Sequence, residues 1–84
     1  MSAPSYARVV IAAQLRVAID DATDAATLEQ LGADRIDAEL LAITLEDALG
    51  IVITDDELAA CTTVGDLLQI CAAKQRPATE RNAA

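Results

Sequence analysis

Few residues in this chain could do chemistry, and their spacing matches none of the usual catalytic or metal sites. The sequence has no histidine, which is the commonest general base and metal ligand. Cys61 and Cys71 lack the spacing of a zinc or redox motif, so we expect both thiols to be buried. Residues 20–24 offer carboxylates without the glycine and glutamate that a calcium loop needs. We therefore expect no catalytic residue and no metal site.

Serines and room for a pocket are also scarce. The only serines are Ser2 and Ser5. A chain of 84 residues forms one domain at most and buries only somewhat more than roughly 60% of its unfolded surface. With 54% apolar residues but a single aromatic, Tyr6, the core consists of small aliphatic side chains, which favours closely packed helices. We expect an all-α domain that is not an enzyme.

The acidic residues are concentrated in the middle of the chain. Thirteen of the fourteen lie between Ile19 and Ala73, where Arg35 is the only basic residue, and the formal net charge is −8. This field repels nucleic acid and anionic lipid, and it attracts basic protein surfaces. Plain solubility is the alternative explanation. No apolar run reaches the length of a membrane span, so we expect a cytoplasmic monomer with no nucleic-acid or membrane partner.

Apolar spacing and capping signals predict the elements that position these residues. The first helix is expected over about Ser5 to Ala18. The apolar residues that recur there at helical spacing are Val9, Val10, Ala13 and Val17. Residues 19–33 lose this spacing and predict a long loop with one capped turn, residues 27–30, closed by Gly32. The two leucines of the loop are expected to anchor it.

The remaining helices have clear start signals. The second begins at the cap Asp34 and ends at Gly50. Its predicted core stripe consists of Leu41, Ile43, Leu45 and Leu49, with Ile36 at the entrance. Residues 54–57 form a capping box for a short third helix that runs through Ala60, and Thr63 caps the fourth. Residues 51–53 are predicted to be a buried connection, since no other segment pairs with them.

Three runs in this part of the chain resemble acyl carrier proteins. They are LGADRID at 31–37, LEDALGI at 45–51 and TTVGDL at 62–67, within an ungapped likeness from about Thr27 to Ile70. The resemblance implies an all-α, up-down four-helix bundle with a long first loop and a short third helix, which capping and periodicity predict independently. We assign residues 1–76 to an acyl-carrier-protein-like domain and 77–84 to a flexible tail.

The resemblance also places one departure at the start of the second helix. That family has Asp-Ser-Leu there, and the serine hydroxyl receives the phosphopantetheine arm, whereas this chain has Asp34-Arg35-Ile36. A guanidinium has no usable lone pair and cannot replace the hydroxyl as a nucleophile. The nearest threonines, Thr27 and Thr44, fall at a cap and in mid-helix. We therefore expect Arg35 to be unmodified and 4'-phosphopantetheine to be absent.

Family resemblance further implies a docking surface for basic faces of enzymes of fatty-acid, polyketide or related lipid synthesis. Where the family usually has an apolar residue followed by glutamate, this chain has Glu39 followed by Leu40, which alters the expected partner set. The candidate docking residues are Asp34, Ile36, Asp37, Glu39, Leu40, Ile43, Glu46, Asp47, Asp55 and Asp56.

Arg35 has three interpretations at this point. It is drift in a degenerate copy, an anion-binding group at a helix start, or an ionic lock for a protein partner. The functional hypothesis is a non-acylated adaptor or regulator. The alternative is an active acyl carrier that holds thioester intermediates through a non-standard attachment residue.

Overall fold

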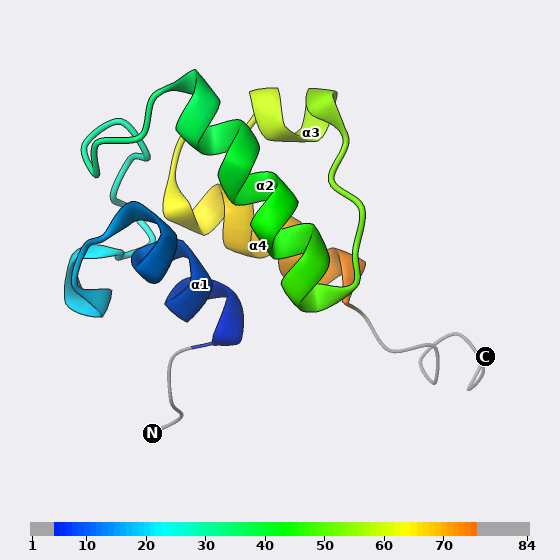
Figure 1. The fold of residues 1–84 in the computed structure, drawn as a ribbon, viewed down its shortest axis with the longest axis horizontal. Helices are drawn as coiled ribbons and strands as arrows, with labels where there is room; N and C mark the ends of the chain where they lie inside the picture. The colour runs from blue at the N-terminus through cyan, green and yellow to red at the C-terminus, as the bar shows by residue number, and fades with distance from the viewer. Residues whose placement is uncertain (1–4, 76–84) are drawn as a thin grey trace.

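The computed structural model of the protein describes residues 5–75, which form an all-α fold (Figure 1). Four α-helices follow one another: α1 (Tyr6–Leu15), α2 (Arg35–Leu49), α3 (Asp55–Ala59) and α4 (Val64–Lys74), with one turn of 3-10 helix, η1 (Ile19–Asp21), after α1. The four-helix fold with a long first loop and a short third helix is confirmed. The proposed tail, residues 77–84, lies outside the described part of the chain.

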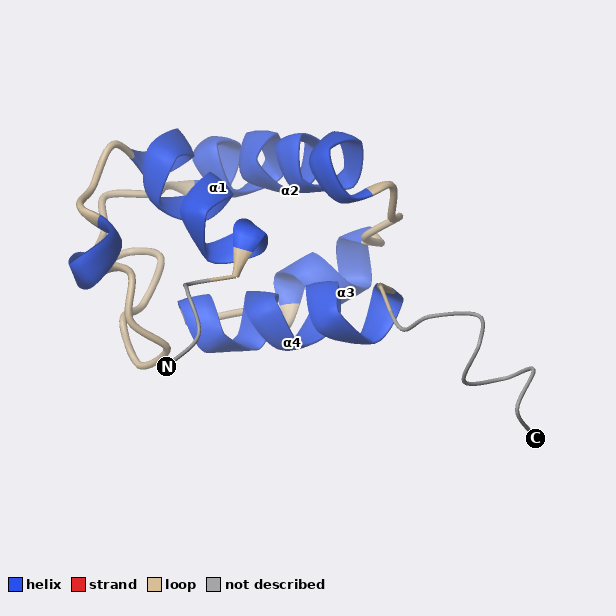
Figure 2. Cartoon of the chain, turned by 90° about the horizontal axis from the view of Figure 1, so that it is seen from below, coloured by secondary structure: helices blue, strands red, loops and turns tan. Residues whose placement is uncertain are grey.

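The helices form two layers around an aliphatic core. α1 and α2 lie together in one layer, and α3 and α4 form the other (Figure 2). Among the described residues, no polar or charged side chain is buried. The core therefore depends on the packing of aliphatic groups. The largest fully buried side chains are Ile11, Leu41, Leu45, Val64, Leu67 and Cys71.

α1 is shorter than the sequence predicted. It ends at Leu15 because Arg16 adopts the left-handed conformation, with a φ of 60°. The N–H groups of Arg16 and Val17 then bond the carbonyls of Ala13 and Ala12, at 3.2 and 3.0 Å. This pattern satisfies the last carbonyls of the helix and turns the chain away. The predicted extension to Ala18 is therefore wrong.

The apolar residues whose spacing indicated α1 are not the ones that it buries. Val9 and Ala13 are exposed, while Val10 and Val17 are only half-buried. Apolar residues cover most faces of this helix, so their spacing alone does not say which face meets α2 and α4. Small side chains allow close approach to both neighbours. The buried residues are Ala7, Ile11 and Ala12.

α2 begins after Asp34 and ends before Gly50, as predicted. Its core stripe is only partly as predicted, because Leu41 and Leu45 are buried whereas Ile36 and Ile43 are exposed. At 3.6 residues per turn, these two isoleucines lie roughly on the opposite side of the helix from the buried leucines. Their placement in the core was therefore wrong. They are also candidate docking residues, a role that requires exposed side chains.

The long loop after α1 is fastened to the rest of the fold. The predicted capped turn is present, since the Thr27 N–H donates to Gln30 Oε1 at 2.9 Å and the Gln30 N–H donates to Thr27 Oγ1 at 3.0 Å. Leu28 is buried in the core and Leu31 is half-buried against it, which confirms their anchoring role. The loop also forms an isolated bridge with the start of α4, between Thr27 and Thr63.

Residues 51–53, which join α2 to α3, are a partly buried connection. Ile51 and Ile53 point into the core, while Val52 is exposed. Glu46 of α2 fixes this segment, because its Oε2 accepts the Ile53 N–H at 2.8 Å. The described helices are all too short, or not apolar enough, to cross a membrane.

Candidate functional site

The start of α2 is built by a reciprocal capping box. Asp34 Oδ1 accepts the Asp37 N–H at 2.8 Å, and Asp37 Oδ2 accepts the Asp34 N–H at 3.1 Å. This box places Arg35 at the first helical position. Within residues 5–75, the N–H groups of Arg35 and Ile36 have no hydrogen-bond acceptor. The cap is complete, but the first turn of the helix remains open to solvent.

The Arg35 side chain is almost fully exposed and weakly paired. Its exposed fraction is 91%, and its Nε lies 3.7 Å from Glu39 Oε2, one turn further along α2. Exposed pairs of this kind contribute little to stability, because water screens them and both side chains lose freedom. The fold therefore does not need Arg35, and most of its N–H donors are free of partners among the described residues.

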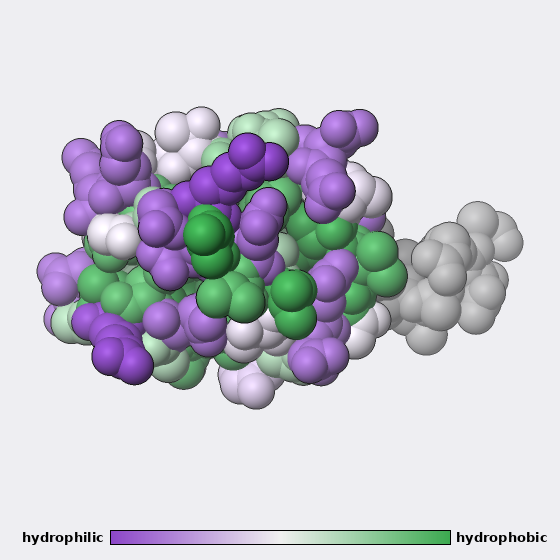
Figure 3. All heavy atoms as spheres, turned by 45° about the horizontal axis from the view of Figure 1, so that its top comes forward, coloured by the Kyte–Doolittle hydropathy of each residue, from purple (hydrophilic) through white to green (hydrophobic). Residues whose placement is uncertain are grey.

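An apolar stripe runs along α2 beside Arg35. It consists of Ile36, Leu40 and Ile43, whose exposed fractions are 65%, 49% and 54%. Spacings of four and three residues put these side chains on one side of the helix. Figure 3 shows apolar side chains lying among hydrophilic ones over this part of the molecule. Apolar surface framed by polar groups is typical of an interaction site.

A groove separates this stripe from α3. One section of it, about 300 Å³, includes Arg35 and Cys61, and the next, about 230 Å³, includes Ile43 and Glu46. The two sections share Glu39, Asp55 and Leu58, so they form one continuous groove between α2 and α3. We call the stripe and this groove together the α2–α3 face.

Sequence reasoning missed part of this groove. Ala38 and Ala42 lie along it, one helical turn apart, and Leu58 of α3 faces them. The sequence did contain a sign of the groove, because Ala38 and Ala42 are small residues four positions apart on one side of the helix. Small side chains leave room between two helices. The groove itself, however, depends on where α3 packs, which local spacing does not reveal.

The predicted acidic docking residues fall into two groups. Asp34, Asp37 and Glu46 each accept a backbone N–H and therefore hold the fold. The other four carboxylates accept no hydrogen bond from the described residues, and the weak pair between Glu39 and Arg35 is their only ionic contact there. These four carboxylates, which are all exposed, belong to Glu39, Asp47, Asp55 and Asp56. The second group is available to a partner.

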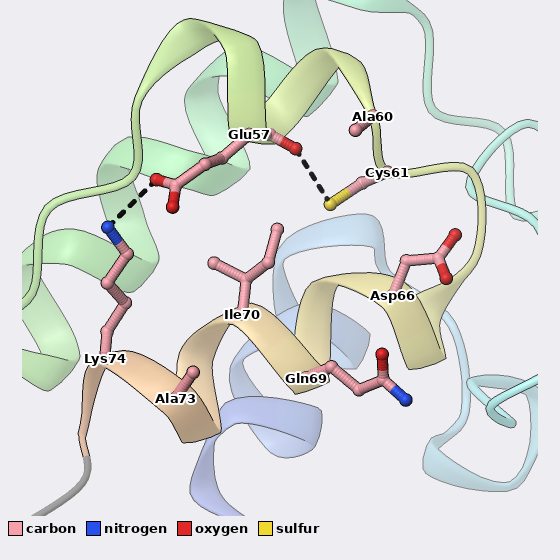
Figure 4. A pocket seen from close by; sticks show the side chains of 8 residues that line it. All are labelled: Glu57, Ala60, Cys61, Asp66, Gln69, Ile70, Ala73 and Lys74. Carbon is pink, nitrogen blue, oxygen red and sulfur yellow. Dashed lines mark hydrogen bonds and ion pairs between the residues drawn. The ribbon is translucent and has the colours of Figure 1, made fainter.

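α3 is held in place by α4. Glu57 Oε1 accepts the Thr54 N–H at 2.9 Å and lies 3.0 Å from Lys74 Nζ (Figure 4). The bond from Thr54, and then the contact with Lys74, lower the pKa of Glu57. Ile70 of α4 points toward α3 beneath this pair (Figure 4). These contacts join the short helix, which carries Asp55, to α4.

The cysteines offer no reactive thiol. Cys71 is buried as predicted, but Cys61 is only partly buried, and its Sγ donates to the Glu57 carbonyl at 3.4 Å (Figure 4). Burial raises the pKa of Cys61 to about 11, and it also raises the pKa of Cys71. Both thiols stay protonated near neutral pH and are poor nucleophiles. Residues 5–75 contain no cluster of three or more potential metal-ligating side chains.

Comparison with known proteins identifies this architecture. Residues 5–71 match the family model described as "Phosphopantetheine attachment site". The chain is 39% identical to an acyl carrier protein of a Sulfurovum species over 61 residues, which cover 71% of this chain and 81% of that protein. It is 32% identical to an acyl carrier protein of Chlamydia trachomatis over 76 residues, 89% of this chain and 99% of that one.

A third relative is matched over a smaller part of its length. The chain is 36% identical to acyl carrier protein MbtL of Mycolicibacterium paratuberculosis over 53 residues, which are 63% of this chain and 60% of MbtL. The helical fold and the family model define a domain of the phosphopantetheine carrier class. This chain belongs to the acyl carrier protein family, whose members are carriers rather than catalysts.

Proposed function

We propose that this chain is a carrier-type module that lacks the phosphopantetheine arm and acts as an adaptor or regulator. Its partners would be enzymes of fatty-acid, polyketide or related lipid synthesis. The observation that carries the proposal is the exposed Arg35 side chain, which directly follows the cap Asp34 at the first position of α2. The proposal takes the attachment serine of the family to correspond to this position, as the resemblance of the surrounding residues implies.

The residues around this position do not fit attachment of the arm. A guanidinium carries N–H donors and no nucleophilic lone pair. Two of the nearby hydroxyls are engaged, since Thr27 Oγ1 accepts the Gln30 N–H and Thr44 Oγ1 donates to the Leu40 carbonyl at 3.0 Å. Ser5 Oγ is also engaged, since it accepts the Arg8 N–H at the start of α1. None of these three hydroxyls is a convincing substitute for the missing serine.

The α2–α3 face supports the adaptor role. It combines exposed apolar side chains with carboxylates that hold no part of the fold, Glu39 and Asp55 among them. Such a surface is complementary to a partner that has apolar contacts and basic residues around them. Because the exposed parts of Arg35 and of the apolar stripe contribute little to the core, their position together on one face supports binding rather than folding.

Intact mass after incubation with coenzyme A and a broad-specificity phosphopantetheinyl transferase tests this proposal. We expect the natural chain to keep its mass and an Arg35→Ser variant to gain one arm. This result means that the fold still binds the transferase and that a single residue prevents attachment.

Gain of an arm by the natural chain would contradict the proposal and support the alternative of an active carrier. Peptide mapping would then identify the attachment residue. An Arg35→Ala variant is the matched control, because it removes the guanidinium without adding a hydroxyl. It must stay unmodified if attachment in the serine variant occurs at position 35.

A further inference from the structure

We propose that the partner of the α2–α3 face presents a carboxylate to Arg35, within a surface that is otherwise basic and apolar. This inference rests on the proposed function, because it describes the partner of the same face. It makes Arg35 a specificity-determining residue, and it distinguishes this interpretation from drift and from binding of a free anion.

The position of Arg35 means that a bound partner covers it. Arg35 follows the cap and precedes Ile36, the first residue of the apolar stripe, and it also lines the groove that contains Asp55. A partner that buries Ile36 and Leu40 and reaches the groove must therefore pass over the guanidinium. Its 91% exposure in the free chain is then largely lost.

Burial of this guanidinium needs a partner that the described chain itself does not supply. The contact with Glu39 involves Nε alone, at 3.7 Å, which is longer than a charge-assisted hydrogen bond. The terminal nitrogens of the guanidinium have no acceptor within residues 5–75. A charge that is covered without hydrogen bonds opposes binding strongly, whereas a carboxylate accepts two parallel N–H groups from arginine.

The carboxylates around Arg35 determine which charges the rest of the partner surface must carry. Glu39 and Asp55 border the groove, so basic side chains of a partner fit around Arg35 but are repelled at Arg35 itself. The complementary surface is therefore one carboxylate with basic residues around it. A surface that is basic throughout places a like charge against Arg35, which selects against such partners.

Zero-length crosslinking tests this inference. An Arg35→Lys variant places an amine at the position, and a carbodiimide links an amine to a carboxylate only where the two are in contact. The tagged variant is treated with carbodiimide in a soluble extract of the cells that make this protein, and crosslinked peptides are identified by mass spectrometry. We expect the introduced lysine to be joined to an Asp or Glu of another protein.

Capture of a protein does not suffice, because the linked residues must be mapped. Arg35→Gln, which has no crosslinkable amine, is the matched control and must lose this peptide. With the partner purified, we expect Arg35→Gln to weaken binding by about tenfold or more, as for other interface charge pairs that lose one member. Arg35→Glu should weaken it further, and replacement of the linked carboxylate by lysine should restore binding to Arg35→Glu.

Three results would overturn the inference. If crosslinks join Glu39 or Asp55 to partner lysines while the introduced lysine links to no partner carboxylate, the face binds a basic surface and the proposed function stands without this inference. If Arg35→Gln binds the partner as tightly as the natural chain does, the inference also fails while the proposed function stands. If no residue of the α2–α3 face is crosslinked to another protein, both the inference and the adaptor role fail.

Discussion

The starts of α2 and α4 have the same local chemistry but opposite surroundings. Each has a polar cap whose side chain accepts the N–H three residues later, and each has an aspartate there that bonds back to the cap. The first helical residue differs, because Val64 of α4 is fully buried and Arg35 of α2 is almost fully exposed. One start is part of the core and the other is a free surface.

The long first loop produces this difference. The Val64 N–H donates to the Ala26 carbonyl and the Gly65 N–H to the Asp24 carbonyl, both at 2.9 Å, so the loop closes the first turn of α4. Arg8 holds the loop there by contacting the Ala22 carbonyl and the Asp24 carboxylate. The equivalent N–H groups at the start of α2 have no acceptor in the described chain. Of these two helix starts, the loop thus covers that of α4 and leaves that of α2 open.

Serine at the first position of each helix gives the largest expected difference. Val64→Ser removes methyl contacts from the core and buries a hydroxyl, so we expect a loss of about 3 kcal/mol of unfolding free energy. Arg35→Ser should change it by less than about 0.5 kcal/mol, as at other exposed sites. Urea unfolding of both variants measures these two changes in unfolding free energy. Similar losses in the two variants would contradict the contrast in burial.

Alanine at the second position of each helix should give a smaller difference in unfolding free energy between the two starts. A Cβ on Gly65 would lie 2.9 Å from the Asp24 carbonyl oxygen, so the loop backbone must shift in Gly65→Ala. We expect a cost of about 1–3 kcal/mol. At the matching position of α2, Ile36→Ala should cost less than about 0.5 kcal/mol because Ile36 is exposed. A neutral Gly65→Ala would show that the loop does not close on α4.

Removal of the caps should affect both helices equally. Asp34→Ala and Thr63→Ala each delete one side-chain acceptor for a helix N–H, and we expect each to cost about 1 kcal/mol. Thermal or urea unfolding at neutral pH compares the two variants. If only one variant were destabilised, the two starts would differ in local chemistry and not merely in burial.

The smallest effect is a dependence on pH at the start of α4. The N–H groups of Thr62 and Thr63 donate to Asp66 and lower its pKa in the folded chain. The ionised carboxylate therefore stabilises the fold above the ordinary pKa of about 3.9, and this contribution is lost as pH falls through the lowered value.

We expect the difference in unfolding free energy between the natural chain and Asp66→Asn to be largest near neutral pH and to shrink at about pH 3, below the ordinary pKa of an aspartate. Urea unfolding at the two pH values measures it. A difference that stays constant between them would mean that ionisation of Asp66 is not what stabilises this helix start.

The caps could be predicted from sequence because their partners are three residues apart. Asp34, Thr54 and Thr63 were each identified as helix starts from the local sequence, and the structure confirms all three. The turn at Thr27 was found in the same way. Local hydrogen bonds need no knowledge of the fold.

Burial could not be predicted equally well, because it depends on which neighbours each helix meets. Ile36 and Ile43 fit an apolar repeat yet face solvent, and Val9 does the same on α1. In a chain with 54% apolar residues, several faces of a helix satisfy the same periodicity. The groove between α2 and α3 was missed for a related reason, since it exists only once α3 packs opposite the small residues of α2.

The proposed function requires that the open start of α2 carries Arg35 in place of an attached arm. The most direct measurement is the intact mass of this protein isolated from the cells that produce it. We predict the mass of the unmodified polypeptide. A mass increased by one phosphopantetheine, with or without an acyl group, would contradict the claim and show that the chain is an active carrier.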